Sequence, residues 1–458
     1  MKTQQLTCFL MSVALCVVPS SARADGEKLV TQIVNLLSNP DREFRAAALE
    51  AVRSSAKGTS QTQTFAAELP KLDAEAQAAL IAALGDRGDV AARPAILEQL
   101  AGSKNEAVRA AALAALGEIG SLSDLPALVN ALGSVSNAEQ QAAETALVRM
   151  RDVWVAKTIV TDLRTAPPEV RSKLIEILAV RRATSEIPAI IAATTDTDSS
   201  VRAAAMNALG LIGKPEQLAA MLPGVLMASR GGERDNAERN VAEVCERIEN
   251  ENERGDALIA ALDTVDAGKR DELMPLAGRV GGQRLIRFVA DIASSSDASR
   301  RTFGIDALSK WPDAGPADTL LEIANNTKDA TERRQAFHAF VKVCASRDNR
   351  NDQQRLDRMK QAMKESRNAD EKTAVINRTR TAYDVESMRF VRPWLDQPEF
   401  CQIACETIVE LAHHRQVRDP NKEEFDAVLD QVIKLAKNEE LVERANRYKR
   451  GETWERKK

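Results

Sequence analysis

Two segments decide the fold of this chain, Val108-Arg-Ala-Ala-Ala-Leu-Ala-Ala-Leu-Gly-Glu-Ile-Gly120 and Val201-Arg-Ala-Ala-Ala-Met-Asn-Ala-Leu-Gly-Leu-Ile-Gly213. They agree at most positions and begin 93 residues apart, which is three times 31. Fixed periods of about 20–50 residues are typical of supersecondary units that stack on one another. The two segments therefore predict a repeat of about 31 residues.

Weaker copies of the segment follow one another along the chain. If its second residue is taken as a marker, the copies begin at Arg45, Gln77, Arg109, Gln140, Arg171, Arg202, Ala237, Arg270, Arg301, Arg333, Lys372 and Cys401. In nearly every copy the fourth and seventh residues after the marker are apolar. This spacing predicts a helix that buries one face. Longer steps after Arg202 and Arg333 mark polar insertions at 229–235 and 347–354, which we expect to form loops.

The marker helix has a start signal and a partner helix upstream. Four residues before the marker stand Asp41, Asp73, Asn105, Asp198, Asp266, Asp297, Asp329 and Asn368. Asp and Asn accept hydrogen bonds from the unpaired amides of a first helical turn, so each is a predicted N-cap. The upstream apolar stretches open at Pro94, Pro126, Pro188 and Pro316, and proline is well suited to a helix start. Glycine pairs such as Gly210 and Gly213 are expected to end helices.

Each unit is thus predicted to be helix, short turn, helix, and about 12 such pairs must stack to bury their apolar stripes. Low aromatic content, 3%, also favours packed helices over sheets. The segment that begins Asp198-Ser-Ser-Val-Arg202 resembles the HEAT repeats, in particular the short type of bilin-lyase-like proteins. The resemblance covers roughly residues 27–415 and is poor around 215–240 and 345–400. It implies an all-α, right-handed superhelix whose second helices line a concave, partner-binding face.

In that family the repeat Asp and Arg also form hydrogen bonds along the stack. The resemblance therefore gives a structural role to Arg45, Arg109, Arg202, Arg301 and Arg333. Deoxyhypusine hydroxylases, which have similar repeats, hold iron with His-Glu pairs, but none of the three histidines here precedes a glutamate. Bilin lyases act on cytoplasmic pigment proteins, which does not agree with the export signal described next.

The first residues have the features of a secretory signal. An apolar run from Leu6 to Val18 is too short to span a bilayer and is followed by Ala22-Arg23-Ala24. We predict that residues 1–24 are a signal peptide cleaved after Ala24, and that the protein is periplasmic or secreted. A lipid anchor on Cys16 is the competing interpretation, although Leu15 is bulky where lipoprotein signals have a small residue. The repeats are predicted to fill 25–419, capping helices 420–443, and a basic, flexible tail 444–458.

Four cysteines remain after signal removal, Cys245, Cys344, Cys401 and Cys405. An oxidising compartment permits disulfides, but the first two lie three repeats apart, too far for a bond. We predict four free, mostly buried thiols. Cys401, Cys405 and His413 are spaced for one helical face and are the closest approach to a metal site, with His414 beside them. Cys405 occupies an apolar repeat position, so we expect it to pack as a hydrophobe and predict no metal.

The sequence predicts no catalytic residue and no cofactor, because no nucleophile, phosphate-loop or haem-attachment motif is found. With 63 Lys and Arg against 67 Asp and Glu, the sequence predicts no nucleic-acid ligand. We expect a non-catalytic scaffold that binds another exported protein through an extended surface. The alternative is an accessory subunit that recognises a polysaccharide, on whose sugars Trp154, Trp311 and Trp394 can stack. An enzyme is the third hypothesis.

Overall fold

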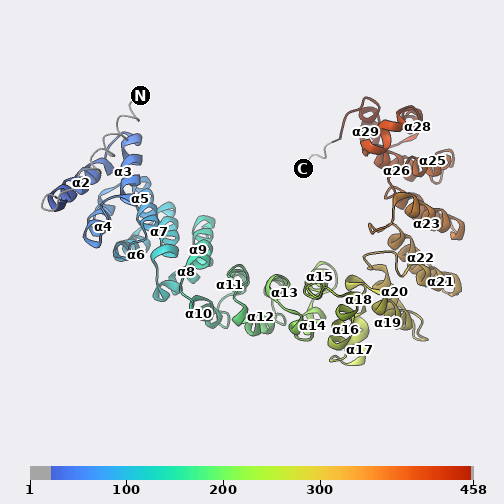
Figure 1. Cartoon of the computed structure of the whole chain (residues 1–458), viewed down its shortest axis with the longest axis horizontal. Helices are drawn as coiled ribbons and strands as arrows, with labels where there is room; N and C mark the ends of the chain where they lie inside the picture. Colours follow the sequence, from blue (N-terminus) through green and yellow to red (C-terminus); the bar gives the residue numbers. More distant parts are fainter. Residues whose placement is uncertain (1–21, 455–458) are drawn as a thin grey trace. The chain divides into compact units, whose positions relative to one another are not determined.

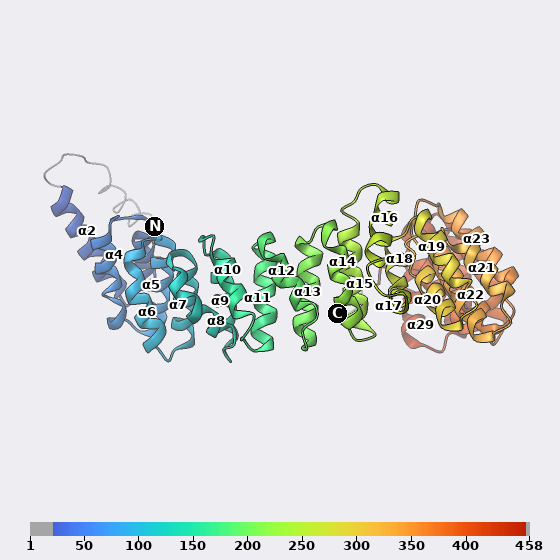
Figure 2. The same cartoon turned by 90° about the horizontal axis from the view of Figure 1, so that it is seen from below.

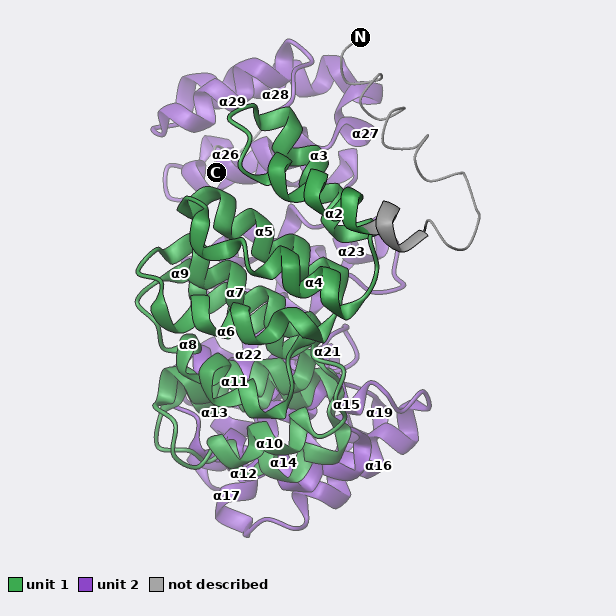
Figure 3. Cartoon of the chain, turned by 90° about the vertical axis from the view of Figure 1, so that its left-hand side faces the viewer, with its two compact units in different colours: residues 1–213 green, residues 214–458 purple. Residues whose placement is uncertain are grey.

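The computed structural model describes residues 22–454, and all regular elements in this range are helices (Figure 1). They belong to two compact units, residues 1–213 and 214–458 (Figure 3). The first unit contains six successive helix pairs and the second contains seven. The prediction of an all-α solenoid of stacked helix pairs is confirmed for this part of the chain. The predicted signal peptide, residues 1–24, lies outside the described range except for residues 22–24, which begin α2.

In the first unit the pairs follow one another without interruption. Its helices are α2 (Ala22–Leu37), α3 (Arg42–Ser54), α4 (Thr59–Ala66), α5 (Ala74–Arg87), α6 (Arg93–Gly102), α7 (Glu106–Ile119), α8 (Leu125–Leu132), α9 (Asn137–Arg149), α10 (Val155–Asp162), α11 (Pro168–Val180), α12 (Ile187–Ala193) and α13 (Ser199–Ile212). The second helices of neighbouring pairs, such as α5, α7 and α9, lie side by side (Figures 1 and 2). Short 3₁₀ turns lead into α5, α6, α8 and α12.

The second unit has the same pairs with more departures. Its helices are α14 (Leu218–Met227), α15 (Gly232–Cys245), α16 (Glu251–Leu262), α17 (Ala267–Glu272), α18 (Met274–Val280), α19 (Gln283–Ala293), α20 (Ala298–Ser309), α21 (Ala317–Asn326), α22 (Ala330–Cys344), α23 (Asp352–Glu365), α24 (Ala369–Thr379), α25 (Val385–Val391), α26 (Cys401–His413), α27 (Arg415–Arg418), α28 (Lys422–Leu435) and α29 (Glu439–Lys449). The marker helix of the Arg270 copy is broken into α17 and α18. Pro275 explains the break, because proline lacks an amide hydrogen and its ring clashes with the preceding turn.

The predicted apolar stripe forms the core of both units. The fourth and seventh residues after each marker are buried in the clear copies, including Leu113 and Leu116 in α7 and Met206 and Leu209 in α13. Leu49 is the exception and is half-buried. The helical register read from the sequence is therefore confirmed.

The predicted N-caps are also confirmed, with one exception. A side-chain oxygen accepts a hydrogen bond from the first turn of the following helix at Asp41, Asp73, Asn105, Asp198, Asp297, Asp329 and Asn368. Asp266 precedes the short α17 and makes no such bond. Ser136 caps α9 in the same way, and the search for Asp and Asn alone missed it. The prolines stand at the starts of α6, α8, α12 and α21 as predicted.

The prediction that both glycines of a pair end a helix is half correct. Gly213 is the C-cap of α13, but Gly210 lies inside that helix. The equivalent Gly117 of α7 shows why glycine stands there. A Cβ atom at Gly117 would lie 2.7 Å from the Cα atom of Ala146, so glycine allows α7 and α9 to approach closely. This inner glycine therefore serves helix packing and not helix termination.

The repeat arginines connect the two helices of their own pair, and three of them also bind the next pair. All five donate to backbone carbonyls at the end of the first helix of their own pair or in the turn after it: Arg45, Arg109, Arg202, Arg301 and Arg333. Three also bind the carboxylate of a later second helix or its first turn: Arg109 with Glu139 at 2.7 Å, Arg301 with Glu332 at 2.8 Å and Arg333 with Glu371 at 2.9 Å. The structural role that the resemblance implied for these arginines agrees with these bonds.

The predicted insertions are partly helical. Gly232 and the residues that follow it extend the first turns of α15, and Asp352 begins the long helix α23. Each insertion therefore consists of a short loop and added helical residues. The regions 215–240 and 345–400, where the repeat pattern is weak, keep the paired-helix architecture.

The C-terminal region differs from the expectation of a flexible tail over 444–458. α28 and α29 form a final pair, and α29 continues to Lys449. Tyr448 is fully buried, and the guanidinium groups of Arg418 and Arg444 lie over its ring. Burial of this large aromatic side chain fixes the segment. The ordered cap therefore extends beyond residue 443.

Candidate functional site

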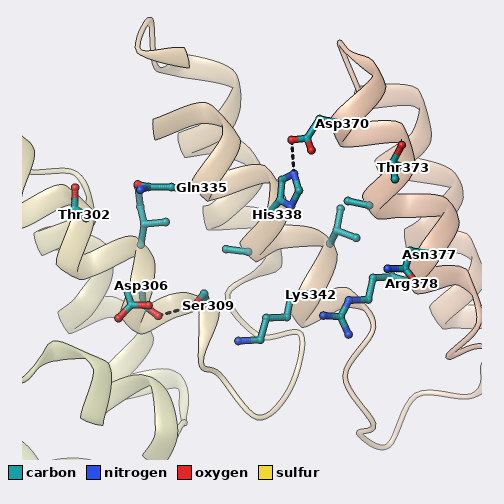
Figure 4. A pocket seen from close by; sticks show the side chains of 14 residues that line it. Thr302, Asp306, Ser309, Gln335, His338, Lys342, Asp370, Thr373, Asn377 and Arg378 are labelled. Carbon is teal, nitrogen blue, oxygen red and sulfur yellow. Dashed lines mark hydrogen bonds and ion pairs between the residues drawn. The ribbon is translucent and has the colours of Figure 1, made fainter. Parts of the chain in front are cut away.

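A groove lies on three successive second helices, α20, α22 and α24, of the second unit (Figure 4). Its volume is about 590 Å³. We call it the α20–α22–α24 groove. Asp306, His338 and Asn377 stand at the same place in the three helices, the fifth residue after the marker. This position faces away from the apolar stripe, so the repeat itself presents these side chains to the groove.

The floor of the groove is apolar. Ile305, Ala339 and Val341 line it and are almost completely buried. Polar groups surround this floor, among them Ser309, whose hydroxyl group donates to the carbonyl oxygen of Asp306. An apolar base with a few polar groups around it is the usual composition of a ligand pocket.

Two cations of the groove have no acidic partner. Lys342 and Arg378 form no ion pair within 4.0 Å in the part of the chain that the structure describes, and both side chains are exposed. Partial removal from water lowers the pKa of Lys342, and Asp306 opposes this shift. The nearby charges of Arg378, Lys310 and Arg279 lower it further. Positive charge is therefore concentrated at this end of the groove.

The acids of the groove are already paired. Asp370 binds Arg334 and His338, each at 2.9 Å. Although burial opposes it, the hydrogen bond from His338 and the charges of His338 and Arg334 lower the pKa of Asp370. Asp306 lies 3.3 Å from Lys310. The unneutralised charge of the groove is therefore positive.

A buried carboxylate holds the helices beside this groove together. Glu238 in α15 is 2% exposed and binds Arg234 at 3.3 Å, Arg279 at 2.9 Å and Lys310 at 3.3 Å. It therefore links α15, α18 and α20. The marker of this copy is Ala237 and not arginine, so the repeat pattern gave no sign of the cluster.

Smaller grooves also lie between second helices of the first unit. One of about 300 Å³ lies between α9 and α11 and is lined by Glu144, Lys173 and Glu176. Burial, together with the charge of Glu144, raises the pKa of Glu176. Lys173 lies 3.1 Å from Glu144. Arg149, which also lines the groove, lies 3.3 Å from Glu118, so both cations of this groove are paired. It therefore lacks the free positive charge found in the α20–α22–α24 groove.

The candidate metal ligands do not form a site. Cys401 and Cys405 are buried in α26, and His413 shares a hydrogen bond with the hydroxyl group of Tyr448 at 3.0 Å. No set of three His, Cys, Asp or Glu side chains within residues 22–454 is arranged to hold a metal ion. All four thiols are free and buried, as predicted. Burial raises the pKa to about 12 for Cys245, Cys344 and Cys405.

The three tryptophans considered for sugar binding have different surroundings. Trp311 is buried in the core, and Trp394 is half-buried against Phe400, with ring centroids 5.2 Å apart. Trp154 is 55% exposed, and the ammonium group of Lys157 lies 5.2 Å from its ring. Among the three, Trp154 is the most exposed to solvent.

The stacked pairs, the shared register and the cross-pair arginines define an α-solenoid protein. No helix among the described residues has the length and apolar character to span a membrane. Within this class, residues 62–148 and 157–242 match the family model of HEAT repeats. The α20–α22–α24 groove lies outside the matched segments.

The comparisons with known proteins add structural likeness only. No curated protein sequence matches the chain. Among solved structures, it is similar to Kap121p, with 11% identity and a TM-score of 0.47 over 94% of this chain and 53% of Kap121p. Kap121p bound to Ste12p gives 11% identity and a TM-score of 0.49 over the same shares, and Kap121p bound to Nup53p gives 12% and 0.48. The chain spans about half the length of these structures.

Proposed function

We propose that this chain is a non-catalytic, exported scaffold that binds another exported protein through the exposed faces of its second helices. The observation that carries the proposal is the α20–α22–α24 groove, which combines an apolar floor with two unpaired cations on three successive second helices. Solenoids of stacked repeats commonly bind their partners on such extended surfaces. Export rests on the signal-like residues 1–24. The 31-residue steps and the arginine bonds support assignment of the repeats to the short, bilin-lyase-like type.

The test is affinity capture of the full chain from its own host after mild cross-linking. We expect one envelope or secreted protein to be recovered in an amount comparable to the chain itself. Recovery of no protein from these fractions contradicts the scaffold proposal. Mass spectrometry of the captured chain also tests export, because we expect the mature N-terminus at Asp25.

A second candidate function is polysaccharide recognition, which the exposed ring of Trp154 favours. Affinity electrophoresis in gels that contain polysaccharides tests it. Retardation that is lost in Trp154→Ala but kept in Trp394→Ala supports this candidate. Equal mobility with and without polysaccharide rejects it.

A further inference from the structure

Three consecutive copies in the second unit carry a basic residue at the same repeat position. The ninth residue after the marker is Arg279 in α18, Lys310 directly after α20 and Lys342 in α22. The first two are neutralised by Asp235, Glu238 and Asp306. Lys342 and the neighbouring Arg378 are not, in the residues that the structure describes. Two unpaired cations beside each other repel, and a bound anion relieves this repulsion.

The other lining residues of the groove determine which kind of anionic ligand fits it. Its floor of Ile305, Ala339 and Val341 favours a ligand with apolar groups next to its charge. The Oδ1 atom of Asn377 is buried without a hydrogen-bond donor in the described residues, and a peptide N–H group is a suitable donor. His338 provides the single aromatic ring of the lining, so the groove lacks a broad stacking surface. These features favour a peptide over a sugar polymer.

The length of the groove also fits an extended peptide. It crosses three second helices, which at about 8–10 Å per helix contact corresponds to roughly 20 Å. An extended chain covers this distance with about six residues. A volume of about 590 Å³ lies within the usual range for ligand pockets of about 300–1,000 Å³.

We propose that the α20–α22–α24 groove binds an acidic side chain, flanked by an apolar residue, from an extended segment of the partner protein. The guanidinium group of Arg378 and the ammonium group of Lys342 pair with the carboxylate, and the apolar neighbour packs on Ile305 and Ala339. This inference rests on the scaffold function proposed above and adds the chemistry of the partner.

The experiment is selection of peptides from a random 12-residue display library on the immobilised full chain, followed by affinity measurement with the selected peptide. We expect the selected sequences to share an Asp or Glu next to an apolar residue. Replacement of that acid by its amide in the peptide is expected to weaken binding by roughly tenfold. Sequences without a shared acid, or no selected sequence, overturn the proposal.

Variants of the chain test whether the selected peptide binds in the α20–α22–α24 groove. K342E/R378E is expected to lose binding by at least about tenfold, and to regain it for a peptide in which the acid is replaced by lysine. The matched control R287E/K328E changes the charge equally at two exposed, unpaired residues, one on the first helix α19 and one in the turn before α22. The control is expected to bind normally. Equal loss in both variants, or unchanged binding in K342E/R378E, rejects the groove. If the charge reversals impair folding, K342Q/R378Q replaces K342E/R378E in the binding measurement.

Affinity capture distinguishes a failure of the groove assignment from a failure of the scaffold function. If K342E/R378E captures the same host protein as the wild-type chain, the scaffold function holds and the groove assignment fails. If neither chain captures a protein, the scaffold function itself fails. Binding of a sulfated polysaccharide with no selected peptide also overturns the inference, in favour of a polymer ligand.

Discussion

The two units are built from the same helix pair but keep its repeat to different degrees. In the first unit the marker positions are 31 or 32 residues apart, and glycine, arginine and N-cap residues recur at the same places. In the second unit the steps vary from 29 to 39, α17 and α18 replace one continuous helix, and a buried Glu238 cluster appears. The α20–α22–α24 groove lies in this second unit. The residues that recur in each repeat thus stabilise the stack. Residues that occur in single copies form the groove and the buried Glu238 cluster.

The largest expected effect distinguishes two equivalent ion pairs. Arg333 and Glu371 are almost completely buried, with side chains 9% and 1% exposed, whereas Arg109 beside Glu139 is 34% exposed. Glu371→Ala leaves a buried guanidinium group without its partner and should cost about 3–5 kcal/mol. Glu139→Ala should cost clearly less, because water reaches Arg109. Urea unfolding followed by circular dichroism measures both, and equal losses contradict the comparison.

The next effect tests the apolar register. Leu209→Ala should lower the free energy of unfolding by about 2–5 kcal/mol, because the side chain is fully buried in α13. Leu211→Ala, two residues further on and 67% exposed, is the matched control and should leave the melting curve nearly unchanged. If Leu209→Ala melts like the wild-type chain, the register is wrong.

A glycine substitution tests the close approach of second helices. Gly117→Ala introduces a methyl group 2.7 Å from the Cα atom of Ala146 and should cost about 1–3 kcal/mol. Gly102→Ala places the same group where no atom lies within 4 Å, so its melting temperature should not fall. A harmless Gly117→Ala would show that α7 and α9 pack less tightly than described.

A smaller effect distinguishes a regular cap from an irregular one. Asn105 accepts hydrogen bonds from two amides of α7, so Asn105→Ala should cost about 1 kcal/mol. Asp266 makes no side-chain cap bond to α17, and Asp266→Ala should have less effect. Thermal unfolding of the two variants measures both losses of stability. A greater loss of stability for Asp266→Ala would contradict the expected order.

The smallest effect depends on pH. The hydrogen bond from Arg109 lowers the pKa of Glu139 below the usual 4.5, against the opposing effect of burial. A lowered carboxyl pKa stabilises the folded state above the unfolded value, and this stability is lost as pH falls through the folded value. The stability difference between wild-type chain and Glu139→Gln should therefore be constant near pH 7 and shrink below about pH 4.5. A difference that does not change with pH excludes this role for Glu139.

The sequence predicted what depends on local spacing. Apolar residues at the fourth and seventh positions, N-caps four residues before the marker and prolines at helix starts each follow from neighbours along one helix. It missed what depends on contacts between distant segments. Examples are the packing role of Gly117, the buried Tyr448 and the Glu238 cluster, in which Lys310 lies 72 residues from Glu238 along the chain.

The candidate groove was within reach of the sequence but was not found. The fifth position after the marker holds Asp306, His338 and Asn377 in the three copies that form the groove, and the ninth position holds Lys342 in the middle copy. An alignment of the copies would have shown basic residues at the ninth position of three consecutive copies, Arg279, Lys310 and Lys342. It would not have shown that Arg334 neutralises Asp370 while Lys342 stays unpaired, because rotamers and distances decide this.

The most direct test of the central claim is photo-crosslinking in the host cell. A benzophenone amino acid replaces Thr373, which lines the α20–α22–α24 groove, and in a separate chain Arg287 on the first helix α19. We predict a single protein adduct from position 373 and none from position 287. Adducts of equal yield at both positions, or at position 287 alone, would contradict binding through the second helices.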